Sequence, residues 1–282
     1  MARDVPACLG HGALGSSKFR NASIKYTPSP SCTACIAMNK RSQWGEDRRL
    51  LPEMAAATSG FARPGTFVEL GALDGVWLSN THLYEKCFGW SGVLIEASNV
   101  NFDKLVRSGR TNSAFVHSAI CSGEPRNISF SHSGKGQTSH QVSNFKLGSE
   151  LMKTAQHVRN VQHVPCRSME AILASNGYNH STLLSLDVEG AELEVLSTVE
   201  PKMFDVIMVE WGSDETQNAG VAERLSGAGM RLLRQWQVAS NAKGGRSRVY
   251  GSPSFVRAWE HFALQTFGSV PVSGRRHSFA AY

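Results

Sequence analysis

The chain has 282 residues, of which 41% are hydrophobic and 18% are charged, and its formal net charge is +6. This length allows one sizeable hydrophobic core with a tail or an insertion outside it. The sequence contains no apolar run of about 18 residues, which excludes a membrane-spanning helix. It also lacks a basic stripe interleaved with aromatic residues, which argues against nucleic acid as a partner.

Positive charge is concentrated in residues 1–41, which hold six basic residues and one acidic residue. This segment is rich in serine and lacks the apolar core of a secretory signal. The composition predicts a flexible basic arm, and a transit peptide for an organelle is the alternative. We therefore expect a cytoplasmic protein, unless the arm directs it to an organelle.

The arm contains Cys32-Thr-Ala-Cys35, which has the spacing of a zinc half-site or a redox pair. No second Cys pair or His pair completes a four-ligand set. The spacing is therefore interpreted as a coincidence or an adventitious disulfide. Three Asn-x-Ser sequences, at Asn21, Asn127 and Asn179, would matter only in a secretory lumen, and chance is the simpler explanation.

Behind the arm, the pattern of apolar residues, glycines and capping residues predicts an alternating α/β series. Strands are expected at 66–70, 92–96, 113–120, 182–188 and 205–211, with helices at 50–57, 80–87, 99–108, 168–175, 191–199 and 214–227. The strands are short and continuously apolar, as in a parallel sheet covered on both faces. Residues 230–239 and 248–250 predict a closing antiparallel hairpin.

The same pattern divides the chain into a basic arm (1–41), one α/β domain (42–254) and a C-terminal extension (255–282) that shows no clear period. Within the domain, residues 128–132 and 161–166 predict additional strands. The polar and poorly periodic stretch 133–160 between them is interpreted as an insertion or lid.

Acidic residues end four of the expected parallel strands: Glu69, Glu96, Asp187 with Glu189, and Glu210. Because the carboxyl ends of parallel strands face the ligand crevice, these carboxylates are expected to share one site. Glu96 follows Gly71 at nearly the spacing at which an acid on the second strand accepts both hydroxyls of a ribose.

The turn after the first strand distinguishes between two cofactors. A nicotinamide dinucleotide needs Gly-x-Gly-x-x-Gly, whereas this turn reads Gly71-x-x-x-Gly75, with Glu69 before it and Asp74 inside it. Two extra carboxylates would repel a pyrophosphate. They suit S-adenosylmethionine, which carries an amino group, a sulfonium and a ribose. Ser79 and Asn80, at the start of the next helix, complete the predicted cofactor-binding turn.

The residues that carry these features also resemble the successive motifs of the FkbM family of S-adenosylmethionine-dependent methyltransferases. The matching segments are 42–47, 67–75, 79–81, 89–96 and 186–192, of which the last, containing Asp187-Val-Glu-Gly-Ala-Glu192, is the most specific. This resemblance implies a class I methyltransferase fold, a Rossmann-like seven-stranded sheet flanked by helices and ending in an antiparallel hairpin.

By position, the resemblance implies that Glu69, Gly71 and Gly75 form the methionine side of the cofactor site and that Glu96 holds the ribose. It places Ala119 beside the adenine and Asp187 with Glu189 beside the transferred methyl group. The sequence departs from the family at Leu73, where relatives commonly have a polar residue such as Asn.

The reaction implied by the resemblance is transfer of a methyl group to a hydroxyl of a sugar-like or natural-product acceptor. A hydroxyl nucleophile benefits from a general base, for which the candidates are Asp187, Glu189 and His140, with His82 and His132 as further histidines. We expect no metal, although Asp187, Glu189 and Glu210 have the oxygen ligands that an ion resembling Mg²⁺ prefers.

Two other functions stay open on the sequence. One is a catalytically inactive descendant of the fold that binds protein or glycan. The other is a nicotinamide-dependent oxidoreductase, which the turn spacing disfavours. The expected partner is a small molecule or glycan.

Overall fold

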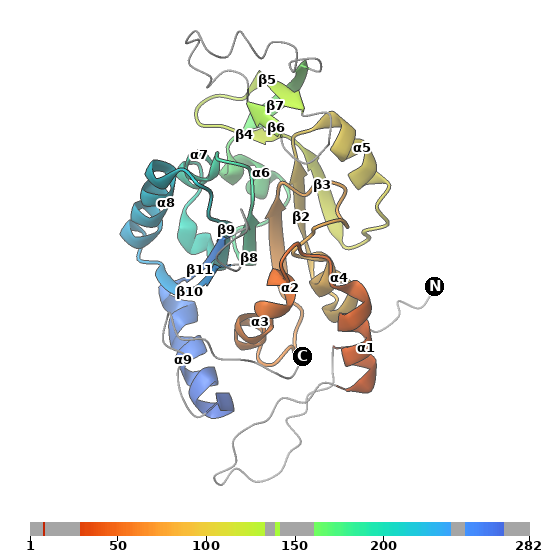
Figure 1. The fold of residues 1–282 in the computed structure, drawn as a ribbon, viewed down its shortest axis with the longest axis vertical. Coiled ribbons are helices and arrows are strands. Elements are labelled where there is room, and N and C mark those ends of the chain that lie inside the picture. Colours follow the sequence, from red (N-terminus) through yellow and green to blue (C-terminus); the bar gives the residue numbers. More distant parts are fainter. Residues whose placement is uncertain (1–7, 9–28, 133–138, 142–160, 238–245, 268–282) are drawn as a thin grey trace.

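The computed structural model describes residues 8, 29–132, 139–141, 161–237 and 246–267 (Figure 1). Its centre is a seven-stranded sheet in the order β10-β11-β9-β8-β1-β2-β3. The strands are β1 (Thr66–Leu70), β2 (Ser91–Glu96), β3 (Ser113–His117), β8 (Ser181–Leu186), β9 (Phe204–Glu210), β10 (Arg231–Gln237) and β11 (Arg246–Gly251). All neighbours are parallel except β11, which is antiparallel to both β9 and β10. The predicted fold class is thereby confirmed.

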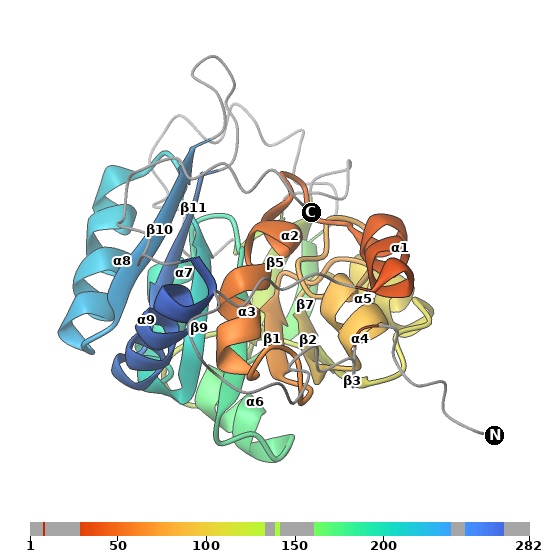
Figure 2. The same cartoon turned by 90° about the horizontal axis from the view of Figure 1, so that it is seen from below.

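Alternating side chains of the central strands belong to two separate hydrophobic cores, one on each face of the sheet. Phe67 belongs to one cluster and Val68 to the other, because successive side chains of a strand point to opposite faces. The first face is covered by α1 (Pro30–Asn39), α3 (Leu51–Ala57), α4 (His82–Phe88) and α9 (Pro253–Phe267), toward which Figure 2 looks. The second is covered by α6 (Met169–Ser175), α7 (Glu192–Ser197) and α8 (Glu215–Gly227).

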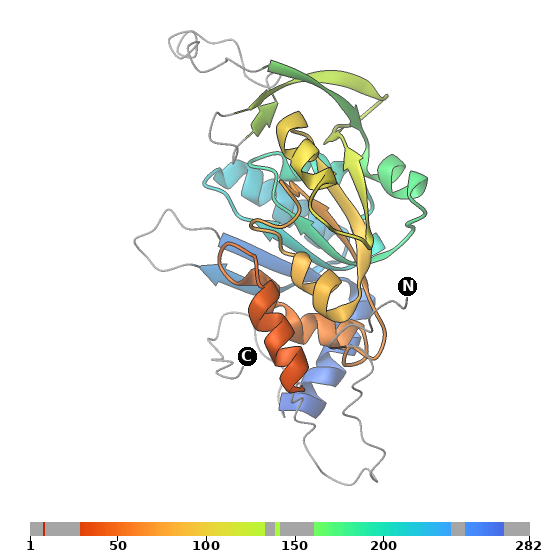
Figure 3. The same cartoon turned by 90° about the vertical axis from the view of Figure 1, so that its right-hand side faces the viewer.

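A second, four-stranded sheet lies beyond the end of β3, with the order β4-β7-β5-β6 (Figure 3). Its strands are β4 (Ala119–Ile120), β5 (Arg126–His132), β6 (Ser139–Gln141) and β7 (Val161–Arg167). The predicted third strand at 113–120 is therefore two strands. The chain leaves the main sheet at Ser118, whose hydroxyl donates to the carbonyl oxygens of Ala119 and Pro165. Most of the expected insertion at 133–160 lies outside the described residues.

Helix boundaries follow local capping chemistry. Ser98 caps α5 (Asn99–Val106), one residue before the expected start, and Ser168 and Asp214 cap α6 and α8. The expected helix at 50–57 is observed as α3, with Pro52 near its start, and a separate short helix, α2 (Glu46–Arg49), precedes it. The extension that the sequence left unplaced begins with α9, whose Trp259 is buried against the core.

The N-terminal segment is part of the fold from Pro30 onward, where a flexible arm was expected. Helix α1 packs against α4, and the two are joined by a disulfide between Cys35 and Cys87. Cys32 is bonded to Cys8, so the two cysteines of the Cys-x-x-Cys sequence have different partners. This pairing rules out the zinc half-site and the Cys32–Cys35 redox pair, and it replaces the interpretation as a coincidence or an adventitious disulfide with two disulfides to other segments. The first seven residues and 9–28 lie outside the described part.

A buried ion pair joins the two ends of the domain. Glu53 of α3 is fully buried and accepts a hydrogen bond from Arg234 of β10, whose guanidinium lies 5.7 Å from the ring centre of Trp259 on α9. Because a buried charge is costly without a partner, Glu53 and Arg234 fix how α3, β10 and α9 meet.

The Cys35–Cys87 disulfide should stabilise the domain by restricting the unfolded chain. It closes a loop of 52 residues, and a loop of that size corresponds to about 4 kcal/mol in the chain-entropy account. We expect the double variant Cys35→Ser/Cys87→Ser to lose about 2–4 kcal/mol of unfolding free energy in urea titrations. With both thiols removed, no stray cysteine complicates the comparison. An unchanged midpoint would show that α1 is held by packing alone.

Candidate functional site

The turn that follows β1 is held by the buried carboxylate of Glu69. This carboxylate accepts hydrogen bonds from the Ser79 hydroxyl (2.8 Å), the Asn80 backbone N–H (2.7 Å) and the Thr81 hydroxyl (2.5 Å). Glu69 thereby ties the end of β1 to the start of α4. Ser79 in turn accepts from the backbone N–H of His82, the first residue of α4 (3.0 Å), although the N-cap residue is Thr81 and not Ser79 or Asn80.

Arg110, which is almost entirely buried, completes the same network. Its guanidinium donates to Glu85 (2.7 Å), the Gly75 carbonyl (2.7 Å) and the Thr81 hydroxyl (3.1 Å). A buried charge with this many partners fixes geometry more than it adds stability. The loop between β1 and α4 is consequently rigid at both ends.

Gly71 is required because β1 and β8 meet closely at their carboxyl ends. Its φ is +76°, and a Cβ atom there would lie 2.0 Å from the carbonyl oxygen of Asp187. Only glycine fits such a position. This close approach brings Asp187, distant in sequence, next to the first turn.

A cavity of about 630 Å³ opens at the carboxyl ends of β1, β2, β8 and β9. Its wall also includes Gln43, from the segment before α2, which a β-bridge between Ser42 and Leu78 holds against the turn. The acidic residues that line it are Glu69, Glu96, Asp187, Glu189, Glu210 and Asp214, and no Lys, Arg or His is found among its described lining residues. The cavity therefore favours cationic or neutral ligands.

Glu96 lies at the end of β2, and only 5% of its surface is exposed. Its carboxylate accepts hydrogen bonds from the backbone N–H groups of Leu73 and Ser98, both at 2.8 Å. Burial nevertheless raises the pKa of Glu96 to about 7, because the desolvation of the charged form outweighs these hydrogen bonds.

Asp187, Glu189 and Glu210 form a carboxylate cluster in which one oxygen of each lies within 4.8 Å of the others. Burial raises the pKa of Asp187 well above its usual range, and the neighbouring Glu210 carboxylate raises it further. Burial and Glu210 also raise the pKa of Glu189. Three oxygen ligands at this separation could hold a hard divalent cation or share a proton.

Three residues of the cavity wall adopt a left-handed backbone conformation that is unusual outside glycine. They are Leu73 (φ +49°), Leu78 (φ +61°) and Glu189 (φ +56°). Such conformations gather at functional sites, where the surrounding structure imposes them. At Leu73 the family resemblance leads us to expect a polar residue such as Asn, which tolerates this region better than leucine.

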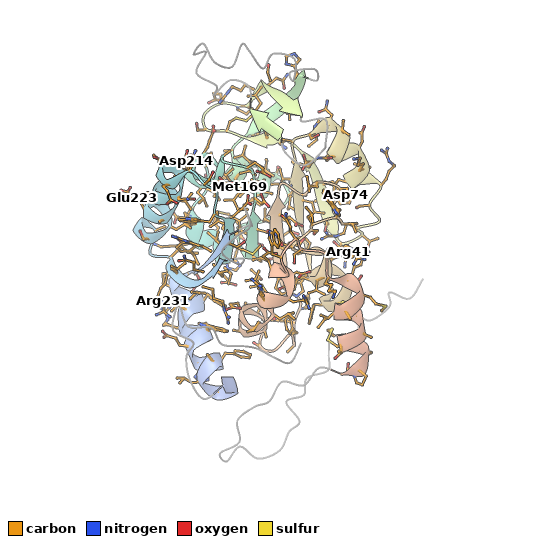
Figure 4. All side chains as sticks on the ribbon, in the orientation of Figure 1. Arg41, Asp74, Met169, Asp214, Glu223 and Arg231 are labelled. Atoms are coloured by element: carbon orange, nitrogen blue, oxygen red, sulfur yellow. A yellow bond between two sulfur atoms is a disulfide. The ribbon has the colours of Figure 1, made fainter. Side chains whose placement is uncertain are left out.

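Most of the sequence-predicted site residues line one cavity. The described lining includes Glu69, Gly71, Ser79, Asn80, Glu96, Ala119, Asp187 and Glu189. Asp74 and Gly75 are absent from this lining. Asp74 instead accepts hydrogen bonds from the backbone N–H groups of Val76 (2.9 Å) and Trp77 (2.7 Å), and Figure 4 labels it toward the right of the view, apart from Asp214 toward the left.

The histidine candidates have other environments. His82 is buried at the start of α4 beside the Asn39 carbonyl (3.3 Å), and its pKa is lowered to about 4 by burial and by Arg110. It stays neutral and does not line the cavity. The backbone of His140 pairs with Ser131 in the second sheet, but its side chain, like that of His132, lies outside the described part.

Gln43, Trp77 and Asn101 are among the lining residues that sequence reasoning missed. Gln43 belongs to the segment 42–47, which carries part of the family resemblance, and this could have indicated that it lies at the site. Trp77 is 45% exposed, an unusual state for so large an apolar side chain, but exposure cannot be read from sequence.

The strand order, the glycine turn at the switch between β1 and β8, and the acidic cavity define a class I methyltransferase. The sequence matches the Methyltransferase FkbM domain over residues 69–237, more than half of the chain. The chain therefore belongs to the FkbM methyltransferase family, and its cofactor is S-adenosylmethionine.

Solved structures with a similar arrangement are distant in sequence. The METTL16 MTase domain is 10% identical over 74% of this chain and 67% of that one, with a TM-score of 0.46. Aeropyrum pernix fibrillarin, which has natively bound S-adenosyl-L-methionine, is 10% identical over 73% and 76% (TM-score 0.39). A SAM-dependent methyltransferase from Aquifex aeolicus is 11% identical over 78% and 97% (TM-score 0.37). No curated protein sequence matches the chain.

The cavity fits this cofactor on two observations. The side-chain oxygen Oδ1 of Asn80 is buried with no partner among the described residues, while the Asn80 amide donates to Ser185 (3.0 Å). A buried acceptor without a donor is costly, and an ammonium group would satisfy it. Glu96 lies at the end of the second strand, where an acid accepts the ribose hydroxyls in this class of sheet.

The affinity for S-adenosylhomocysteine should depend on pH through Glu96. Its ionised form is the better acceptor for the ribose hydroxyls, so affinity should fall as pH decreases through about 7. Glu96→Gln should bind about 10-fold or more weakly at pH 8 and lose this pH dependence.

Isothermal calorimetry between pH 6 and pH 8.5 measures both effects. The matched control is Glu124→Gln, which removes an exposed carboxylate that does not line the cavity. Parallel pH profiles for the wild type and Glu96→Gln would contradict the assignment of the ribose to Glu96.

Proposed function

We propose that this protein transfers a methyl group from S-adenosylmethionine to a hydroxyl of an uncharged, sugar-like or natural-product acceptor, with Asp187 as the general base. The single observation that carries this proposal is the environment of Asp187. Its carboxyl has a strongly raised pKa and lines the same cavity as Glu96 and the Gly71 turn.

When bound, the cofactor supplies an electrophilic methyl group on a sulfonium. In this proposal Glu96 accepts the ribose hydroxyls, Asn80 Oδ1 accepts from the amino group, and Ala119 borders the adenine. The buried contacts of Glu69 make it a positioning residue, because its oxygens already accept three hydrogen bonds from the chain. The protein contributes by aligning the acceptor with the methyl group, which is a large part of such catalysis.

Asp187 suits the role of base because of the groups around it. A general base works best when its pKa lies near the operating pH, and an ordinary aspartate is too acidic. Burial, and then the charges of Glu210 and Glu189, raise the pKa of Asp187 and so make it more basic. The hydroxyl proton would pass to Asp187 as the oxygen attacks the methyl group. Glu189, which is more exposed, would receive it less readily.

The lining charge also bears on the acceptor. The described lining holds six carboxylates and no basic residue, so it would repel a phosphate. A neutral polyol would not be repelled. Trp77, exposed at the cavity wall, offers an aromatic face of the kind that ligand pockets use. These features support an uncharged acceptor over nucleic acid, and the acidic turn speaks against a nicotinamide dinucleotide.

Asp187→Asn should abolish most methyl transfer while retaining the cofactor. We expect a loss of about 10²–10⁴ in kcat, since the amide cannot accept the hydroxyl proton. Transfer of labelled methyl to a panel of glycans and small alcohols measures the loss, and calorimetry with S-adenosylhomocysteine checks that binding persists. A wild type that binds the cofactor but methylates none of the panel would support the catalytically inactive alternative.

Glu210→Gln tests how the base is tuned. Removal of this neighbouring charge should lower the pKa of Asp187, so the rise of kcat with pH should move to lower pH. The pH–rate profiles of the wild type and the variant measure this shift.

The same assay with MgCl₂ or EDTA tests whether the carboxylate cluster of Asp187, Glu189 and Glu210 uses a cation. A shift to higher pH, or activity that depends strictly on added metal, would contradict the proton-acceptor role.

A further inference from the structure

All six cysteines of the chain are paired in three disulfides. Cys8 is bonded to Cys32, Cys35 to Cys87, and Cys121 to Cys166. The pairs bridge 24, 52 and 45 residues and lie in two separate parts of the fold. No cysteine is left as a free thiol. Complete pairing across distant segments is the pattern of a structural framework.

Such a framework indicates the chemistry of the compartment in which the chain folds. Structural disulfides persist in oxidising environments and are rare where glutathione keeps thiols reduced. The six thiols would lose their protons and electrons to a disulfide-bearing oxidant, which becomes a dithiol as each bond forms. This departs from the cytoplasmic location that the sequence suggested.

Two of the Asn-x-Ser sequences lie in the described residues, and both present an exposed asparagine. Asn127 is exposed on β5, two residues before Ser129, and Asn179 is exposed in the turn between α6 and β8, two residues before Ser181. The intervening residues are Ile128 and His180, neither of which is proline. In an oxidising secretory lumen, both sequences are acceptors for N-linked glycans.

We propose that Asn127 and Asn179 are N-glycosylation sites of a chain that folds oxidised in a secretory lumen. The side-chain Nδ2 of each asparagine forms a bond to the anomeric carbon of an oligosaccharide carried on a lipid pyrophosphate. The nitrogen loses one proton, and the lipid pyrophosphate leaves as that bond to carbon breaks. This inference is independent of the methyl-transfer proposal.

Both sites are compatible with an open cavity. Asn179 precedes the first residue of β8, and the cavity is at the opposite, carboxyl end of that strand. Asn127 neighbours Ile128, which lines the cavity, but successive residues of a strand point to opposite faces. Asn127 accordingly points to solvent while Ile128 is buried. A glycan at either asparagine leaves the site accessible.

The test uses the full chain immunopurified from the cells that naturally produce it. Treatment with peptide N-glycosidase should reduce its apparent mass and convert Asn127 and Asn179 to aspartate, which peptide mass spectrometry detects. Alkylation without a reductant should label none of the six cysteines, and alkylation after reduction should label all six.

Variants returned to the same cells supply the control. Asn127→Gln and Asn179→Gln should each lose one glycan, whereas Asn112→Gln, at an exposed asparagine outside any Asn-x-Ser/Thr sequence, should lose none. Unmodified asparagine at both positions in the native protein would overturn the proposal. So would free thiols at all six cysteines before reduction.

Discussion

The geometry of the site depends on one buried carboxylate, that of Glu69. Its oxygens hold Ser79, Asn80 and Thr81 at fixed places, and Arg110 anchors Thr81 and the Gly75 carbonyl from behind. This network sets the distance between the end of β1 and the start of α4. The backbone of Asn80, whose side-chain oxygen is buried without a partner among the described residues, is held by the same carboxylate. Glu69 therefore shapes the part of the cavity wall that this turn forms.

The second constraint is the contact between Gly71 and the Asp187 carbonyl. It draws β1 and β8 together at their carboxyl ends, so that carboxylates from separate strands share one poorly solvated space. Burial and neighbouring like charges both disfavour the ionised form of a carboxyl group. The raised pKa of Asp187 is therefore a direct result of how the sheet is assembled. If these acidic residues lay on the surface of the protein, their pKa values would stay in the ordinary range.

The parallel strands, the closing hairpin and the strand-end acids that line the cavity could be predicted from sequence, because buried strands and acids at their ends leave local patterns. Helix α1 could not, since its position depends on Cys35 meeting Cys87 and on packing against α4, and cysteine connectivity is not a local signal. Asp74 was assigned to the cofactor by its charge, and sequence gave no sign that its side chain accepts hydrogen bonds from the backbone N–H groups of Val76 and Trp77. The left-handed conformation of Leu73 was equally invisible, because leucine gives no sign of it.

The bridge between Ser42 and Leu78 has a consequence for how relatives can diverge. The match to the family domain begins at residue 69, yet Gln43, which lies before it, forms part of the cavity wall. The wall is thus encoded in two stretches of the chain, one inside the matched domain and one before it. Sequence changes before residue 69 can therefore reshape the cavity while the turn at Gly71 stays intact. Comparison restricted to the common domain would overlook that source of diversity.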